Sequence, residues 1–174
     1  LVTHEHDDHA KGAFKLAEKL NIPVWLSHGT RVMTTRYMPK SEIQIKIVDT
    51  HTPFAIDDIQ ITPFPVPHDA REPTQFVFSD GQYRLGVLTD VGGTTPYIQQ
   101  VLSGCDALVL ECNHDLSMLE TGPYSYALKK RVGGHLGHLD NQSAAHLLAT
   151  LDNSKLKHIV AAHLSAKNNT QALA

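Results

Sequence analysis

The stretch His4-Glu5-His6-Asp7-Asp8-His9 concentrates side chains of metal-ligating type directly after the apolar start of the chain. Two histidines separated by one residue of extended backbone point to the same side, so His4 and His6 can bind one cation. Asp8 and His9, on the following turn, can reach a second cation. The alternative is a solvated polar loop, but such a loop gives no structural reason for three imidazoles beside an apolar segment. The stretch therefore predicts a site for two metal ions.

The composition is typical of one soluble globular domain. The chain has 174 residues, of which 41% are hydrophobic and 19% charged, and we find no internal repeat and no linker. No apolar run approaches the roughly 18 residues that a membrane span requires, which argues against membrane insertion. We expect residues 1–174 to form a single domain. Because the chain opens at Leu1 and enters the motif at His4, we expect its earlier strands to be missing.

Cysteine content and charge restrict the class of protein further. Cys105 and Cys112 cannot form a disulfide framework, and their spacing does not match a zinc knuckle or a redox motif. No signal peptide is visible, so we expect a cytoplasmic location. The formal net charge of −3 argues against a polyanion-binding surface, but the 12 histidines could hold cations that this charge does not count.

The periodicity of apolar residues predicts a mixture of hairpins and strand–helix units. Such a mixture favours sheets covered by helices over an all-parallel wound sheet. Leu1–Thr3 is expected to be the tail of a buried strand. Further strands are expected at 23–26, 43–48, 54–56, 59–64, 74–79, 83–89, 107–111 and 158–162, and helices at 10–20, 30–38, between Thr95 and Gly104, 124–132 and 141–151.

Histidines and aspartates recur directly after these expected strands. His68, Asp90, His114 and His163 each follow one of them, as His4 follows the first. Such segments can converge at one edge of a sheet, which would add ligands to the opening cluster.

The pattern HxHxDH after an apolar strand resembles the signature of the metallo-β-lactamase fold hydrolases. That resemblance implies an α/β (α+β) fold, a four-layer αββα sandwich with metal at its edge. The family also needs a later His, an Asp and a last His, and His68, Asp90 and His163 match them in order. The resemblance implies that the first ion is bound by His4, His6 and His68, the second by Asp8, His9 and His163, and both by Asp90.

The cofactors implied are two divalent metal ions, with zinc favoured and manganese or iron also suited to His and carboxylate ligands. Two ions roughly 3.5–4 Å apart can bridge a water molecule and lower its pKa. They would also change the formal charge from −3 to +1, which makes an anionic phosphate a reasonable substrate.

Two further resemblances concern the reaction. Lactamases with two zinc ions commonly carry a cysteine where this chain has Asp90, which argues against an antibiotic hydrolase. The segment Gly137–Asn141 resembles the GHxS-type motif of phosphodiesterases such as ribonuclease Z, where the histidine assists the departing oxygen. His138 would then be the proton donor. The alternative is a surface histidine leading into a helix capped by Asp140 or Asn141.

Together with the segments Glu111–Asp115 and His163–Asn169, this motif is similar to the YycJ/WalJ-type branch of nuclease-like phosphodiesterases. That branch more often has Ser where Asp140 stands. His114 could contact substrate, or could support the metal ligands or a helix end. Asn168 and Asn169 could bind phosphate, or could close a turn.

The expected function is a dinuclear-metal hydrolase, a phosphodiesterase or nuclease acting on nucleic acid. Asp8 would orient the nucleophile and His138 would protonate the leaving oxygen. The alternatives are hydrolysis of a thioester, lactone or small cyclic phosphate, and a metal-binding scaffold without turnover. The basic run Lys129–Arg131 could follow a nucleic-acid backbone, or could be a solvated helix face.

Overall fold

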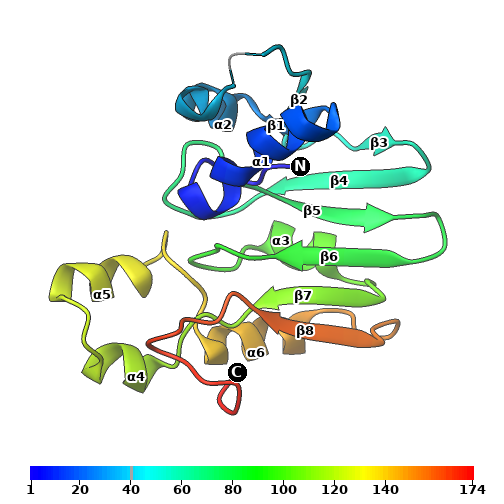
Figure 1. Ribbon diagram of the computed structural model, residues 1–174. Coiled ribbons are helices and arrows are strands. Elements are labelled where there is room, and N and C mark those ends of the chain that lie inside the picture. The colour runs from blue at the N-terminus through cyan, green and yellow to red at the C-terminus, as the bar shows by residue number, and fades with distance from the viewer. Residues whose placement is uncertain (40) are drawn as a thin grey trace.

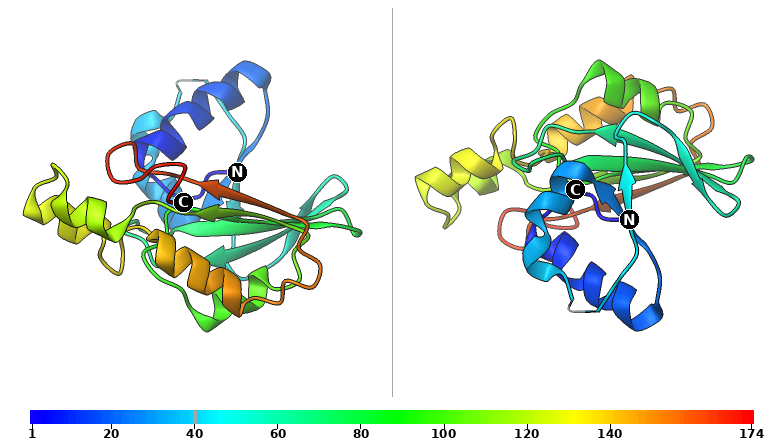
Figure 2. Two further views of the ribbon diagram at one scale, coloured as in Figure 1. Left: turned by 90° about the horizontal axis from the view of Figure 1, so that it is seen from below. Right: turned by 90° about the horizontal axis from the view of Figure 1, so that it is seen from above.

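The computed structural model describes residues 1–39 and 41–174 and arranges them in four layers (Figures 1 and 2). Helix α1 (Asp7–Leu20) packs on a small sheet, and the small sheet packs on a larger one. Helices α3 (Pro96–Leu102) and α6 (Asn141–Thr150) cover the opposite face of the larger sheet. This order of layers agrees with the αββα sandwich expected from the sequence.

The larger sheet has six strands whose order in space is their order in the chain. The first four pair antiparallel, and the last three pair parallel because α3 and α6 lie in the connections between them. The strands are β3 (Phe54–Ile56), β4 (Ile59–Pro65), β5 (Thr74–Ser79), β6 (Arg84–Leu88), β7 (Ala107–Glu111) and β8 (His158–Ala162).

The smaller sheet consists of the parallel strands β1 (Val24–Ser27) and β2 (Ile45–Val48). Its Trp25 ring stacks on the ring of Phe54 with centroids 4.9 Å apart, which joins the two sheets. The expected strand at Leu1–Thr3 is not formed, although the amide of Val2 donates to the carbonyl of Trp25 at 2.9 Å. One hydrogen bond aligns this segment with β1 without making a ladder.

The helices differ from the expected ranges mainly at their starts. Helix α1 begins at Asp7 instead of residue 10, and acidic residues in a first turn favour a helix start there. The side chain of Asp7 is also held by Arg36 and Tyr37, which are distant in sequence. The remaining helices are α2 (His28–Met33), η1 (Thr35–Tyr37), α4 (Leu116–Thr121) and α5 (Tyr126–Val132).

Two details of these helices were not expected. Ser27, not Thr30, caps α2, and α4 was not predicted at all. Asp115 caps α4 by accepting a hydrogen bond from the amide of Met118 at 2.8 Å. Within residues 1–39 and 41–174, no helix combines the length and apolar character needed to cross a bilayer.

The main core lies between the larger sheet and its two covering helices. Leu108 and Leu110 of β7 face Ile98 of α3 and Leu147 of α6, and all four are buried. Full burial of such a side chain contributes about 1.5–3 kcal/mol. This packing fixes the position of β7, and therefore of the residues at its end.

Strands β4, β6, β7 and β8 all end at one side of the larger sheet, on the left in Figure 1. His68 follows β4, Asp90 follows β6, Glu111 is the last residue of β7, and His163 follows β8. Helix α1 brings its first turn to the same edge. The fold therefore gathers polar side chains from five separate segments.

Candidate metal centre

Three histidines from two parts of the chain form the first group of metal-ligating type. His4 and His6 precede α1, and their ring centroids lie 4.6 Å apart. Nδ1 of His6 lies 3.3 Å from Nε2 of His68. One nitrogen from each ring lies within 4.8 Å of the other two. The structure thus brings together the three histidines that the resemblance assigns to one ion.

The environment of these histidines leaves nitrogen lone pairs free for a cation. Nδ1 of His68 contacts the carbonyl of Gly137 at 3.0 Å, and because a carbonyl only accepts, this nitrogen carries the proton and Nε2 carries the lone pair. Burial lowers the pKa of His68. Burial and the neighbouring His9 lower the pKa of His4 to about 3, so its ring is neutral.

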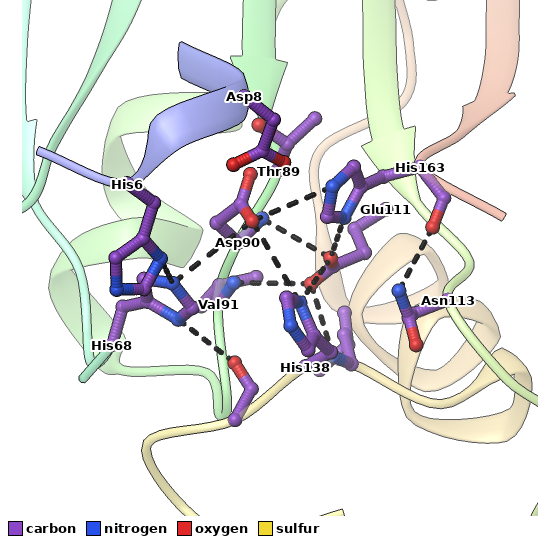
Figure 3. A network of polar contacts seen from close by, with 12 residues as sticks. His6, Asp8, His68, Thr89, Asp90, Val91, Glu111, Asn113, His138 and His163 are labelled. Carbon is purple, nitrogen blue, oxygen red and sulfur yellow. Dashed lines mark hydrogen bonds and ion pairs between the residues drawn. The ribbon is translucent and has the colours of Figure 1, made fainter. Parts of the chain in front are cut away.

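Asp90 lies between the first group and a second one (Figure 3). Its Oδ1 is 3.9 Å from Nε2 of His68 and 3.5 Å from Nε2 of His163, while its Oδ2 is 3.1 Å from Nε2 of His9. Burial favours the protonated carboxyl, but the hydrogen bond from His9 and the nearby His163 outweigh it and lower the pKa of Asp90. Asp90 adopts a φ of 53°, an uncommon backbone conformation that directs this carboxylate between the two groups.

The second group consists of Asp8, His9 and His163, again with one ligating atom from each within 4.8 Å. The Asp8 side chain is 69% exposed and lies 3.5 Å from Nε2 of His9. The hydrogen bond to Asp90 raises the pKa of His9, and the one to Glu111 raises the pKa of His163. These raised pKa values result from the negative charge of Asp90 and Glu111, which would also attract cations.

The residues fit a pair of divalent ions. Nε2 of His4 is buried and has no hydrogen-bond partner among the residues that the structure describes. A buried nitrogen without a partner is costly unless a ligand satisfies it. Imidazole nitrogens combined with carboxylate oxygens are the donors that zinc and related ions use.

Glu111 belongs to a segment that the resemblance named, Glu111–Asp115, but the sequence assigned no role to this residue. Its buried carboxylate accepts hydrogen bonds from three backbone amides, those of Asp90, Val91 and Leu139, at 3.0–3.1 Å. Its Oε1 also lies 2.7 Å from Nδ1 of His163 and 3.0 Å from Nδ1 of His138. Burial alone would raise the pKa of Glu111. The hydrogen bonds from these two histidines have the larger effect, so the pKa is lowered. Its place at the end of an apolar strand was the available signal.

His138 reaches the centre from the loop before α6. Its ring centroid lies 5.3 Å from that of His68 and 5.2 Å from that of His163. The loop is tightly packed, because a Cβ on Gly137 would lie 2.2 Å from the carbonyl oxygens of Arg131 and Val132. The bond from Nδ1 to Glu111 leaves Nε2 of His138 available to a substrate.

The family follows from comparison with known proteins. A family model described as beta-lactamase superfamily domain matches residues 1–163. The chain belongs to this superfamily. Two curated proteins are similar over the whole chain: exodeoxyribonuclease YycJ of Bacillus anthracis, 36% identical, and exodeoxyribonuclease WalJ of Streptococcus pneumoniae serotype 2, 32% identical. The chain spans 66% of the length of each.

A solved structure supports the superfamily fold. The metallo-beta-lactamase fold protein YhfI from Bacillus subtilis shares 16% identity and has a TM-score of 0.73, over 98% of this chain and 66% of that chain. At this identity the likeness concerns the fold alone. The metallo-β-lactamase fold implies divalent metal binding, and it is consistent with the ligand groups described above.

The three residues expected to contact substrate, His114, Asn168 and Asn169, belong to neither ligand group. His114 is buried, lines a hollow beside His138 and forms an isolated bridge with Asp140. Asn168 and Asn169 are also buried. Nδ2 of Asn169 donates to the carbonyl of Cys112 at 2.7 Å, and the carbonyl of Asn168 accepts from the amide of Asp115 at 2.9 Å. These contacts tie the last loop to the segment after β7.

Proposed function

We propose that this protein is a metal-dependent phosphodiesterase that cleaves nucleic acid. The observation that carries the proposal is the position of Asp90 between two groups of ligands, with His138 held beside it by Glu111. The names of the curated relatives, exodeoxyribonucleases, favour DNA as the substrate.

The ligand assignment we propose is the one expected from the sequence. His4, His6 and His68 would hold one ion, and Asp8, His9 and His163 the other, with Asp90 contacting both. Zinc is the metal we favour, because five imidazole ligands suit it, and manganese or iron would fit the same set. When bound, divalent ions supply Lewis-acid stabilisation of negative charge and lower the pKa of a coordinated water.

The chain's own residues would complete the reaction. Asp8 is exposed at the edge of the centre, where its carboxylate can orient the attacking nucleophile. Nδ1 of His138 donates to Glu111, which fixes the orientation of the ring, so Nε2 is the atom that would deliver a proton to the leaving oxygen. Oδ1 of Asp90 lies 3.8 Å from Nδ1 of His138.

Charge supports an anionic substrate. The formal net charge of −3 becomes +1 when two divalent ions are counted. Nε of Arg131 pairs with Asp69 at 2.6 Å. Asp69 in turn lies 3.7 Å from Nε2 of His6, so this pair belongs to the rim of the site.

The test is a comparison of substrates with full-length, metal-loaded protein. We expect turnover of bis(p-nitrophenyl) phosphate and of DNA. In the His138→Ala variant kcat for DNA should fall about 100-fold or more, because a general acid contributes about 10²–10⁴-fold when the leaving oxygen needs a proton. The His158→Ala variant, altered at the exposed start of β8, is the matched control and should retain wild-type kcat. Activity confined to a thioester or a lactone would refute the proposal, and bound metal without any turnover would indicate a scaffold.

We also propose that residues 1–174 form a single domain. The support is that one family model matches residues 1–163. A cytoplasmic location is proposed as well, since Cys105 and Cys112 are both free thiols. Limited proteolysis of the full-length protein, and fractionation of its host, would test these two points.

A further inference from the structure

A hollow of about 360 Å³ is lined in part by His138, and none of the residues of the two ligand groups lines it. Its lining includes His114, Gln142, Ser143 and His146, together with the backbone of Gly92 and Gly93. The volume is within the range of about 300–1,000 Å³ that is usual for sites of small molecules. No part of the proposed metal centre fills this space.

His114 presents an unsatisfied acceptor to this hollow. Nδ2 of Asn113 donates to the carbonyl of His163 at 2.9 Å, so the Oδ1 of Asn113 is the atom that accepts from Nδ1 of His114 at 3.3 Å. Burial lowers the pKa of His114, which keeps the ring neutral and leaves a lone pair on Nε2. The residue is 1% exposed, and its Nε2 has no hydrogen-bond partner in residues 1–39 and 41–174.

The direction of this nitrogen follows from Gly133. A Cβ added to Gly133, which also lines the hollow, would lie 3.8 Å from Nε2 of His114. Nε2 of His114 is therefore a buried, unpartnered acceptor that lies beside Gly133 in the wall of the hollow. A group with an N–H or O–H, such as the ring N–H of a base or the hydroxyl of a sugar, would satisfy it.

A second hollow, of about 580 Å³, continues from the first and shares Leu116 and Gly133 with it. It lies along helices α4 and α5, which project from the body beside the strand ends (Figures 1 and 2). Tyr126 of α5 is 76% exposed, and Nζ of Lys130 lies 5.6 Å from the centre of its ring. An exposed aromatic ring beside a cation is a platform for an unstacked base and its phosphate.

We propose that the two hollows form one track for single-stranded DNA on the leaving-group side of the scissile bond. The first leaving nucleotide lies against His114, and the next base stacks on Tyr126 with its phosphate near Lys130. His138 stands at the start of this track, which is where a proton donor to the leaving oxygen must be. The inference rests on the proposed function, and it states on which side of the site the leaving strand lies.

The first test uses a double variant in the exposed helix, Tyr126→Ala with Lys130→Gln, in full-length, metal-loaded protein. Its KM for a 12-residue oligothymidylate should rise about tenfold, because loss of one stacked base weakens binding by roughly five- to 150-fold. The slope of log(1/KM) against log salt should become shallower by about 0.7, the value for one phosphate contact on a single strand. A merely structural helix would change neither quantity.

The matched control is Tyr83→Ala with Lys157→Gln. Nζ of Lys157 lies 5.0 Å from the Tyr83 ring, so the same pair type exists at the other end of the larger sheet. The control should keep the KM and the salt slope of the wild-type protein. Wild-type values in the Tyr126 variant, or equal losses in both variants, would overturn the track.

A second variant tests the first hollow. His114→Phe keeps a ring but removes the acceptor, and should lower kcat/KM for a thymidine dinucleotide about tenfold, with the midpoint of thermal unfolding as the check on folding. An unchanged kcat/KM would overturn the role of His114.

Measurements on the wild-type protein distinguish failure of the track from failure of the proposed function. Turnover of bis(p-nitrophenyl) phosphate with a salt-independent KM for the oligonucleotide would overturn the track alone. Turnover of neither substrate would overturn the proposed function and the track with it. Preference for an RNA oligonucleotide over DNA at the same site would overturn the assignment to DNA.

Discussion

Oε1 of Glu111 lies 2.7 Å from Nδ1 of His163. The same oxygen lies 3.0 Å from Nδ1 of His138, so one buried carboxylate orients a proposed metal ligand and the proposed proton donor. The ring of His163 therefore turns Nε2 toward Asp90, whose Oδ1 lies 3.5 Å away. Acceptors of this kind fix the tautomer of a ligating histidine and increase its basicity.

Replacing Glu111 should weaken metal binding without removing a ligand. In Glu111→Gln, the amide nitrogen cannot accept from the backbone and imidazole N–H groups that surround it. We expect metal affinity to fall about 10- to 100-fold, the usual effect of losing such a partner. Competition with a chromogenic chelator measures this. The exposed Glu42→Gln variant is the control, and equal affinities in both variants would contradict the role given to Glu111.

Asp90 should decide how many ions are retained. The Asp90→Asn variant keeps the size of the side chain but offers one neutral oxygen in place of two charged ones. We expect elemental analysis to find fewer than two equivalents of metal per chain, against two in the wild-type protein. Asp80→Asn, in the exposed turn between β5 and β6, should retain the wild-type content. Two full equivalents in the Asp90 variant would argue against a bridging position.

Gly137 and Gly12 should respond to alanine in opposite ways. At Gly137 a Cβ would lie 2.2 Å from two carbonyl oxygens, whereas at Gly12 of α1 nothing lies within 4 Å. Gly137→Ala should therefore destabilise the protein by about 3 kcal/mol or more. Gly12→Ala should stabilise it by about 1 kcal/mol, since alanine is the better helix former. Urea unfolding measures both, and destabilisation at Gly12 would contradict the packing.

Asp140 caps the N-terminus of α6. The stability of a variant at this position should therefore depend on how well the new residue caps a helix. Its Oδ1 accepts from the amides of Gln142 at 2.9 Å and Ser143 at 3.0 Å. Asp140→Ala should cost about 1 kcal/mol, whereas Asp140→Ser should stay within about 0.5 kcal/mol because serine also caps. Thermal unfolding distinguishes the two. Equal losses in alanine and serine would indicate that the carboxylate is needed for another reason.

Much of the secondary structure could be predicted because it depends on local patterns. The hairpin around Asp80 and the buried strand Ala107–Glu111 follow from turn residues and from apolar runs, and both are present. The start of α1 at Asp7 had a local signal in its acidic first turn, but it also depends on contacts between distant residues. Asp7 is held there by Arg36 and Tyr37, contacts that no local window contains.

The same distinction, between local patterns and contacts of distant residues, applies to the site. The proposed ligand set came from the family resemblance carried by these His and Asp residues. Strands β4, β6, β7 and β8 run in the same direction and bring the later residues of that set to one edge of the sheet. The roles of Glu111 and His114 depended on atoms brought together from distant segments, such as His163 near Glu111 and Gly133 near His114. Hydrogen bonds and hollows are properties of such distances, and only the packed chain determines them.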